Sequence, residues 1–311
     1  MPSKKHELII IGGGPAGLTA GIYTSRARIP TLIIERMGCG GQAAITDNIE
    51  NYPGFAEGIN GFELSSRMES QARAFGTTIV NDDISGLEKG EDNGWIVRAA
   101  DKQYESRAVI IAAGARYRAL GVPGEEEFTG RGVSYCATCD GAFYRGREVV
   151  VVGGGDSAIQ EALFLTRFAS RVTIIHRRDM LRASAILQER IKENKKISLL
   201  LNSVVTGVSG TEKVSGVTIR NTVTGEQGTY PADGVFVFIG WLPNTGFTSS
   251  LIEKDAQGYI VTDDRMATNI EGIFACGDVR RKLLRQVVTA AGDGATAAIA
   301  VQEYLENLKG K

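Results

Sequence analysis

The sequence predicts an α/β protein that contains two β-α-β units, each with parallel strands. Three observations predict this class. A short apolar run near the start leads into a glycine-rich turn, the same arrangement returns near the middle of the chain, and a second apolar run follows each turn. Continuous apolar runs are typical of parallel strands that are buried on both faces. The two units are therefore predicted to be Rossmann-like nucleotide-binding domains.

The first unit carries every part of a dinucleotide-binding fingerprint. Residues 7–11 read as a strand, residues 12–17 (GGGPAG) as a turn, and the chain then reads as a helix to about Arg28 and a strand over 31–34. Glu35 follows, roughly 20 residues after the turn, where an acid can bind a ribose hydroxyl. Backbone N–H groups of the turn can meet a pyrophosphate at the positive end of the helix. An acidic site of this kind suits FAD or NAD.

The second unit keeps the turn and reverses the charge. Its strand is predicted at 148–152, its turn at 153–158 (GGGDSA), its helix to about Ala169 and its second strand at 172–175. Basic residues then replace the acid: His176, Arg177, Arg178 and Arg182. Guanidinium groups match a 2′-phosphate with charge-assisted bonds, and a helical segment here would place Arg178 and Arg182 on one face. We interpret this unit as NADP(H)-selective; a solvated basic surface is the alternative.

Of the four cysteines, only Cys136 and Cys139 form a Cys-x-x-Cys pair. Such a pair can cycle between disulfide and dithiol. No metal is expected, because a structural zinc needs four ligands and no second Cys or His cluster supplies the other two. Asp140 follows the pair and is either a proton shuttle or a helix-cap or turn residue. Cys39 and Cys276 are predicted to be small buried side chains without a catalytic role.

Together these features predict an enzyme that moves electrons from NADPH to a flavin and from the flavin to a disulfide. The formal net charge of −1 favours neither a nucleic-acid nor a membrane partner. No apolar run is long enough for a signal peptide or a membrane span, so the cytoplasm is the expected compartment.

With these residues in view, the chain resembles the low-molecular-weight, bacterial-type thioredoxin reductases along nearly its whole length. The most specific part of the resemblance is the segment 136–141 (CATCDG) joined to the basic motif at 176–182. Further matching segments lie at 40–42 (GGQ), 50–54 (ENYPG), 243–245 (PNT), 276–278 (CGD), 285–286 (RQ) and 289–292 (TAAG). The resemblance implies the class II pyridine nucleotide-disulfide oxidoreductase fold, with the NADPH domain inserted in the FAD domain.

The resemblance also implies domain boundaries, partners and site residues. The FAD domain would comprise residues 1–117 and 244–311, and the NADPH domain residues 118–243 with the redox-active pair. The protein would be a homodimer that reduces thioredoxin, with Cys139 nearer the flavin than Cys136. The expected FAD residues are Gly12, Gly14, Pro15, Ala16, Gly17, Glu35, Arg36, Gly40, Gly41, Gln42, Asn51, Ala113, Gly114, Gly277, Asp278, Arg285, Gln286 and Val287. The expected NADPH residues are Gly153, Gly155, Asp156, Ser157, Ala158, His176, Arg177, Arg178 and Arg182.

Four other functions fit parts of the sequence. A ferredoxin–NADP reductase of the same fold needs no dithiol. A flavin oxidase that makes disulfides with oxygen needs no NADPH, so the arginines argue against it. The reductase of a peroxiredoxin system usually has an extra N-terminal segment, whereas here the first strand starts at about Glu7. A nucleotide-sensing module with a structural Cys pair would be no enzyme, and flavin absorbance in the purified protein would dismiss it.

Overall fold

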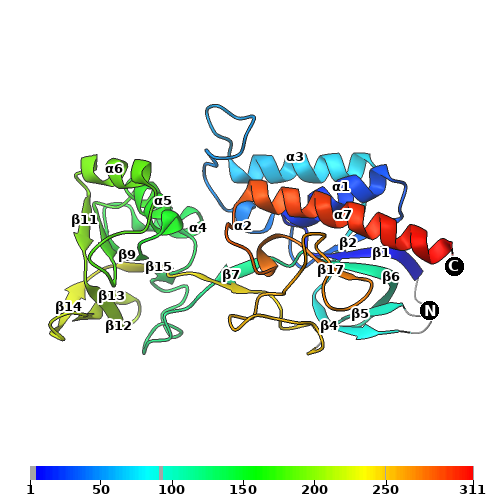
Figure 1. Ribbon diagram of the computed structural model, residues 1–311. Coiled ribbons are helices and arrows are strands. Elements are labelled where there is room, and N and C mark those ends of the chain that lie inside the picture. The colour runs from blue at the N-terminus through cyan, green and yellow to red at the C-terminus, as the bar shows by residue number, and fades with distance from the viewer. Residues whose placement is uncertain (1–4, 91–93, 249, 311) are drawn as a thin grey trace. The chain divides into compact units, whose positions relative to one another are not determined.

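The computed structural model describes residues 5–90, 94–248 and 250–310. The chain divides into two compact units, one formed by Met1–Arg116 with Leu242–Lys311 and the other by Tyr117–Trp241. The two connections between the units include strands β7 (Ala115–Tyr117) and β16 (Trp241–Pro243), which pair as a two-stranded sheet (Figure 1).

The first unit is built on a mixed sheet with the strand order β3-β2-β1-β6-β5-β4, in which β17 also pairs with β6. Strands β1, β2, β3, β6 and β17 are parallel, whereas β4 and β5 form an antiparallel edge. The strands are β1 Lys5–Ile11, β2 Thr31–Glu35, β3 Thr78–Asn81, β4 Ile84–Lys89, β5 Trp95–Ala99, β6 Gln103–Ile111 and β17 Ile273–Ala275. The helices are α1 Pro15–Arg26, α2 Gly41–Ala44, α3 Gly61–Ala74 and α7 Val287–Lys309, with a 3-10 turn at Gly277–Val279.

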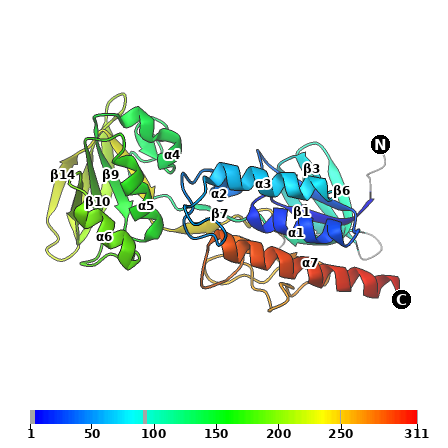
Figure 2. The same cartoon turned by 90° about the horizontal axis from the view of Figure 1, so that it is seen from above.

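Strand β1 is buried on both faces, as its unbroken apolar sequence predicts. Leu8 and Ile10 pack with residues of α1, α3 and α7 in one core cluster. Ile9 and Ile11 belong to a second cluster on the other face of the sheet. Figure 2 shows α1, α3 and α7 lying side by side, and α1 contacts both of the other helices. This packing fixes where the β1–α1 turn points.

The second unit has a parallel sheet with the order β11-β10-β9-β15-β8 and a separate antiparallel sheet of β12, β13 and β14. Helices α5 and α6 pack on one face of the parallel sheet, and the antiparallel sheet packs on the other. The strands are β8 Val133–Ser134, β9 Glu148–Gly153, β10 Arg171–Ile175, β11 Ile197–Leu200, β12 Ser203–Gly210, β13 Val214–Asn221, β14 Gln227–Pro231 and β15 Gly234–Phe238. The helices are α4 Ala137–Asp140, α5 Asp156–Leu165 and α6 Ala185–Glu193, with a 3-10 turn at Gly141–Tyr144.

Both helices that follow the glycine turns end earlier than the sequence suggested. Helix α1 ends at Arg26 rather than near Arg28, because Arg28 has a left-handed backbone with φ of 60°. Helix α5 ends at Leu165 rather than near Ala169. The Lys196 ammonium group donates hydrogen bonds to the Thr166 and Ala169 carbonyls at 2.7 and 3.0 Å and so satisfies the chain end there. No helix in the described ranges is both long enough and apolar enough to span a bilayer.

Candidate functional site

Four segments of the first unit lie at the carboxyl ends of its neighbouring parallel strands. Gly12 follows β1, Glu35 ends β2, Ala113 lies two residues after β6, and Gly277 lies two residues after β17. Carboxyl ends of parallel strands meet at one edge of a sheet, and ligands of open α/β sheets bind at this edge. The structure therefore brings together residues that come from both ends of the chain.

The first glycine turn is shaped for close backbone approach. A Cβ on Gly17 would lie 1.9 Å from the Gly12 carbonyl oxygen, so helix and strand are in contact there. The Gly13 N–H donates to the Glu35 carboxylate at 2.6 Å. A Cβ on Gly14 would meet nothing within 4 Å, so the space above the turn is open. Pro15 occupies the first turn of α1, where its missing N–H costs nothing. The turn fits a pyrophosphate.

Two buried polar atoms next to this edge have no protein partner. They are Asp278 Oδ1 and Arg285 Nε, within the part of the chain that the structure describes. Burial raises the pKa of Asp278, and the nearby charges of Lys282 and Arg285 oppose the rise. The Arg285 guanidinium lies 3.9 Å from the centre of the Tyr259 ring, which holds it in place. Because buried polar groups require partners, these atoms fit a polar ligand such as the ribityl and ring portion of FAD.

Other predicted FAD residues are tied together by hydrogen bonds. The Gly40 N–H donates to the Gly13 carbonyl at 2.8 Å. The Asn51 amide donates to Gln286 Oε1 at 2.9 Å, and Gln286 caps α7 in a reciprocal pair of bonds with Thr289. These contacts join the glycine turn to the 40–42 segment, and Asn51 to the N-terminus of α7.

The remaining predicted FAD residues lie close to these in the chain. Ala16 is buried, Arg36 is exposed, Gly41 and Gln42 begin the short helix α2, and Val287 begins α7. The structure draws Asn244 towards Ala113 and Gly114: its side chain donates to the Ala113 carbonyl at 2.9 Å and its N–H to the Gly114 carbonyl at 3.0 Å.

Sequence reasoning missed the residues that support Gly277 and Asp278. Asp293 accepts a hydrogen bond from the Gly277 N–H at 3.1 Å. It also pairs with Lys282 at 2.8 Å and with Arg280 at 3.4 Å, and all three side chains are nearly buried. The basic run between Arg280 and Arg285 was the available signal, because buried cations need an acidic partner. Nothing local in the sequence pointed to Asp293 as that partner.

The second glycine turn lies at the corresponding edge of the second unit. Gly153 ends β9, Gly155 caps α5, and a Cβ on Gly155 would meet nothing within 4 Å. Asp156 and Ser157 begin α5, and Ala158 is fully buried against the turn. The turn therefore has the same open face for a pyrophosphate as the first one.

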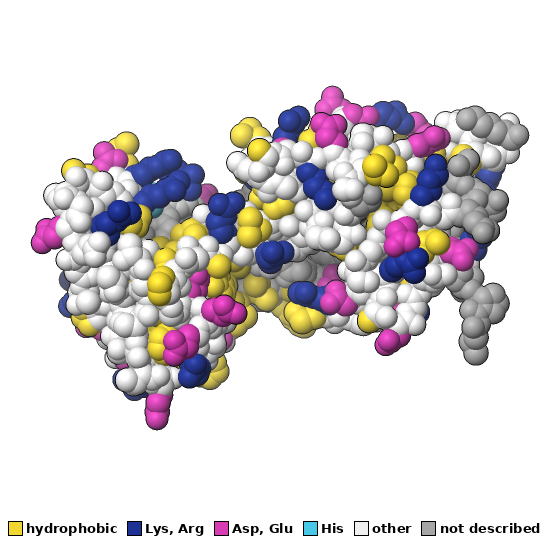
Figure 3. Space-filling model, turned by 90° about the horizontal axis from the view of Figure 1, so that it is seen from below, with side chains coloured by type: hydrophobic (Ala, Val, Ile, Leu, Met, Phe, Trp, Pro, Cys, Tyr) yellow, Lys and Arg dark blue, Asp and Glu magenta, His cyan; other side chains and the backbone are white. Residues whose placement is uncertain are grey.

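The basic residues follow β10, next to this turn. The segment from Arg177 to Ser184 is a loop, so the condition for placing Arg178 and Arg182 on one helical face is not met. The loop is nevertheless fixed: the Thr222 hydroxyl donates to the Arg177 carbonyl at 3.2 Å, and the Asn202 N–H to the Arg178 carbonyl at 3.0 Å. All three arginines are exposed, and Figure 3 shows Lys and Arg side chains gathered on one face of this unit. The group fits a phosphate.

His176 differs from the arginines because its side chain is buried, with 5% exposed. A Cβ on Gly154 would lie 2.3 Å from the His176 Nδ1, so the ring packs against the turn. Burial lowers the pKa of His176, and the charges of Arg182, Arg178 and Arg177 lower it further. The ring is therefore neutral at pH 7 and packs against Gly154 of the turn.

Cys136 and Cys139 form a disulfide. Cys136 follows β8, which is separated from β9 by one strand, so the pair and the glycine turn share a sheet edge about 10 Å apart. The Cys136 sulfur accepts the Cys139 N–H at 3.2 Å and lies 3.4 Å from the Thr138 hydroxyl. Cys139 is exposed. Asp140 ends α4 and its side chain makes no cap hydrogen bond to the following 3-10 turn.

The other two cysteines are free thiols. Burial, with help from Glu69 and Glu35, raises the pKa of Cys39 to about 12. Cys276 is completely buried, and burial also raises its pKa well above the ordinary value. Because the thiolate is the reactive form, neither is poised for redox chemistry at neutral pH.

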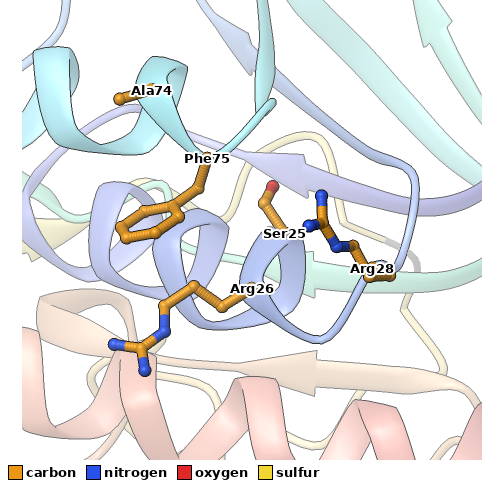
Figure 4. Close-up of a pocket in the computed structure, with 5 residues that line it drawn as sticks. All are labelled: Ser25, Arg26, Arg28, Ala74 and Phe75. Atoms are coloured by element: carbon orange, nitrogen blue, oxygen red, sulfur yellow. The ribbon is translucent and has the colours of Figure 1, made fainter.

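A surface pocket of about 280 Å³ in the first unit contains none of the predicted residues. Figure 4 shows its lining side chains Ser25, Arg26, Arg28, Ala74 and Phe75 between the ends of α1 and α3. Helix α1 has 12 residues and begins at the glycine turn, so this pocket lies roughly 18 Å along the helix from it. It is separate from the nucleotide site.

Comparisons with known proteins agree on one family. Residues 6–294 match the family model described as pyridine nucleotide-disulphide oxidoreductase. Over 307 residues, 98% of this chain and 96% of the relative, the chain is 54% identical to a thioredoxin reductase of Bacillus subtilis. A thioredoxin reductase of Treponema pallidum is 48% identical over 98% of each chain. The solved thioredoxin reductase of Lactococcus lactis matches with a TM-score of 0.95 and 46% identity over 97% of this chain and 99% of that one.

Proposed function

The chain belongs to the pyridine nucleotide-disulphide oxidoreductase family, and we propose that it reduces the disulfide of oxidised thioredoxin with electrons from NADPH. Its relatives at about half identity over nearly the full chain are named thioredoxin reductases. The observation that carries this function is the Cys136–Cys139 disulfide in a unit that also holds a basic nucleotide turn.

FAD, when bound, accepts hydride from NADPH and passes the electron pair to a disulfide. The first unit supplies its site. Gly14 leaves open space where a pyrophosphate would lie, Gly12 and Gly17 let α1 pack closely on β1, and Glu35 lies at the strand end where a ribose would bind. Asp278 and Arg285 offer the unpartnered polar atoms. The N-terminus of α7 at Val287 adds the positive end of a long helix.

The second unit holds NADPH. Gly153 and Gly155 form the pyrophosphate turn, and Arg177, Arg178 and Arg182 supply the positive charge for the 2′-phosphate. Neutral His176 keeps the turn in place. We expect the guanidinium groups to discriminate strongly against NADH, because their charge has no counterpart when the 2′-phosphate is missing.

The sulfur pair completes the transfer. Reduction of Cys136–Cys139 consumes two electrons and two protons and gives a dithiol. In that state the Cys139 N–H and the Thr138 hydroxyl stabilise a thiolate at Cys136. The Cys136 thiolate attacks the thioredoxin disulfide, and Cys139 then displaces the reduced thioredoxin while the Cys136–Cys139 bond re-forms.

Asp140 is positioned to move the protons of this exchange. It lies directly after Cys139, is partly exposed, and makes no cap bond with its side chain. We expect the next residues to contact the partner protein, because Phe143 leaves 81% of its surface exposed close to the sulfur pair.

The chain functions as a homodimer in the cytoplasm. Exposed Tyr23 and Ile299 on the neighbouring helices α1 and α7 support association between copies. Light scattering of the purified protein at several concentrations tests the dimer, and a single species with the mass of one chain contradicts it.

Replacing Cys136 or Cys139 with serine tests the central proposal. Either variant should lower thioredoxin reduction by roughly a thousandfold or more, because no intramolecular dithiol remains. Bleaching of the flavin band by NADPH should persist, since hydride transfer precedes the sulfur step. Cys39→Ser serves as the matched control and should retain full activity. Thioredoxin reduction at a normal rate in either pair variant would show that another group carries the electrons.

A further inference from the structure

Asp156 was expected to bind the nucleotide, but its carboxylate is engaged within the protein. It accepts a hydrogen bond from the Ser184 N–H at 2.7 Å, across 28 residues of chain. Ser184 is the residue that caps α6, and its own side chain makes no cap bond. The carboxylate therefore fastens the start of α6 to the first residue of α5.

A second tie lies two residues earlier in the same segment. The Arg182 N–H donates to the Gly154 carbonyl at 2.7 Å. Between the two ties, Ala183 is buried with 5% exposed, and its carbonyl accepts the Gln188 amide at 2.7 Å. The backbone is thus tied to the glycine turn at Arg182 and to the first residue of α5 at Ser184, although the Arg182 side chain is exposed.

The first unit has only one of these two ties. There the Gly40 N–H donates to the Gly13 carbonyl at 2.8 Å, which corresponds to the Arg182 bond. At the position of Asp156 the first turn has Pro15, which has no carboxylate to offer. Among the described residues of the two turns, the side-chain bond to the segment after the second strand is the one that Asp156 makes beside the arginines.

We propose that Asp156 is a positioning residue for nucleotide specificity, which holds the Arg182 segment in place so that the guanidinium group meets the 2′-phosphate without further ordering. The inference rests on the proposed NADPH site. A side chain whose backbone is already fixed loses less conformational entropy when it binds its ligand. Asp156 therefore strengthens phosphate binding without contacting the phosphate.

Charge repulsion alone predicts the opposite effect on phosphate binding, so an experiment can separate the two explanations. A carboxylate near the site repels a 2′-phosphate, so its removal alone should tighten binding. Loss of the Ser184 bond should instead weaken binding. Asp156→Asn separates the two, because the amide keeps an acceptor oxygen and loses the charge. Asp179→Ala is a charge-matched control, since Asp179 is an exposed acid within the basic loop.

The experiment titrates the flavin-loaded protein and its variants with adenosine 2′,5′-bisphosphate and, separately, with 5′-AMP by calorimetry. In Asp156→Ala we expect bisphosphate affinity to fall about three- to tenfold, the scale of one ordinary hydrogen bond, because the Arg182 segment is no longer held by the Ser184 bond, and we expect AMP affinity to stay unchanged. Asp156→Asn and Asp179→Ala should each bind the bisphosphate at least as tightly as the parent does, because both lose a negative charge and neither loses the Ser184 bond. In turnover, Asp156→Ala should raise the KM for NADPH at unchanged kcat.

Two results overturn the inference alone. One is an Asp156→Ala variant that binds the bisphosphate as well as the parent or better. The other is an equal loss for both ligands, which means that Asp156 serves the shared part of the nucleotide or the fold. A loss of flavin absorbance or a lower melting temperature would identify an effect on the fold. If the parent protein itself does not prefer the bisphosphate, the NADPH assignment fails first.

Discussion

In both glycine turns a side chain from the end of the second strand contacts the middle glycine, but the kind of contact differs. In the first, the Glu35 carboxylate accepts the Gly13 N–H at 2.6 Å. In the second, the His176 ring packs against Gly154. Both supporting residues follow their glycine by the same number of positions and lie at the end of the second strand. The shared backbone needs a support at this position, whereas the nucleotide decides which side chain provides it.

The turns also differ at their last residue. In the first, a Cβ on Gly17 would lie 1.9 Å from the Gly12 carbonyl oxygen. In the second, the corresponding residue is Ala158, which already carries a Cβ and is fully buried. Helix and strand are therefore closer in the first unit, and only there is the third glycine a steric requirement.

The largest effect follows from this steric difference. Gly17→Ala should push α1 away from β1, cost about 3 kcal/mol of stability as an overpacked contact, and abolish FAD binding. Absorbance near the flavin bands measures this directly, and the variant should be colourless. Ala158→Gly is the reciprocal change and should keep flavin and NADPH oxidation, with about 1 kcal/mol lost. A yellow Gly17→Ala protein would show that the first turn is not so tightly packed.

The turns and strands were predictable because their signals are local. Glycine spacing, apolar runs and the residue after the second strand all lie within one β-α-β unit, and the sequence predicted the strands that begin both units. Cys136 and Cys139 were predictable for the same reason, since their separation in the chain already permits a bond.

Contacts between distant segments could not be predicted in this way. The pairing of Asp293 with Lys282 and Arg280 depends on how α7 packs beside β17. The loop form of residues 177–184 likewise depends on Asn202 and Thr222, which reach it from beyond α6. Because such contacts are set by tertiary packing, no local propensity reports them.

Removing the positive charge of the second unit's basic loop should give the next largest effect. Replacement of Arg177, Arg178 and Arg182 by glutamine should raise the KM for NADPH about a thousandfold or more, since each of the three charged hydrogen bonds contributes about 1.5–3 kcal/mol. The KM for NADH should change little. Steady-state rates with both nucleotides measure the ratio. Equal changes for the two nucleotides would mean that the arginines form only a solvated basic surface.

The smallest effect concerns the neutral His176 ring, which packs against the second glycine turn. Because burial and the three arginines lower the pKa of folded His176, the unfolded chain takes up the proton first as the pH falls. The stability that the neutral His176 ring provides is complete above about pH 6.5, the pKa of a histidine in the unfolded chain. It is lost progressively as the pH falls below that value. The melting temperature should therefore decline below that pH, and less steeply in His176→Gln. His6→Gln, which changes the other histidine, should keep the parent slope.

The same titration tests whether the three arginines contribute to the lowered pKa of His176. In the triple arginine variant the like charges around His176 are gone but its burial remains. The pH dependence should therefore shrink without disappearing, because burial is the main cause of the lowered pKa. An unchanged slope would mean that the arginines do not act on the ring, and the second turn would then be supported by packing alone.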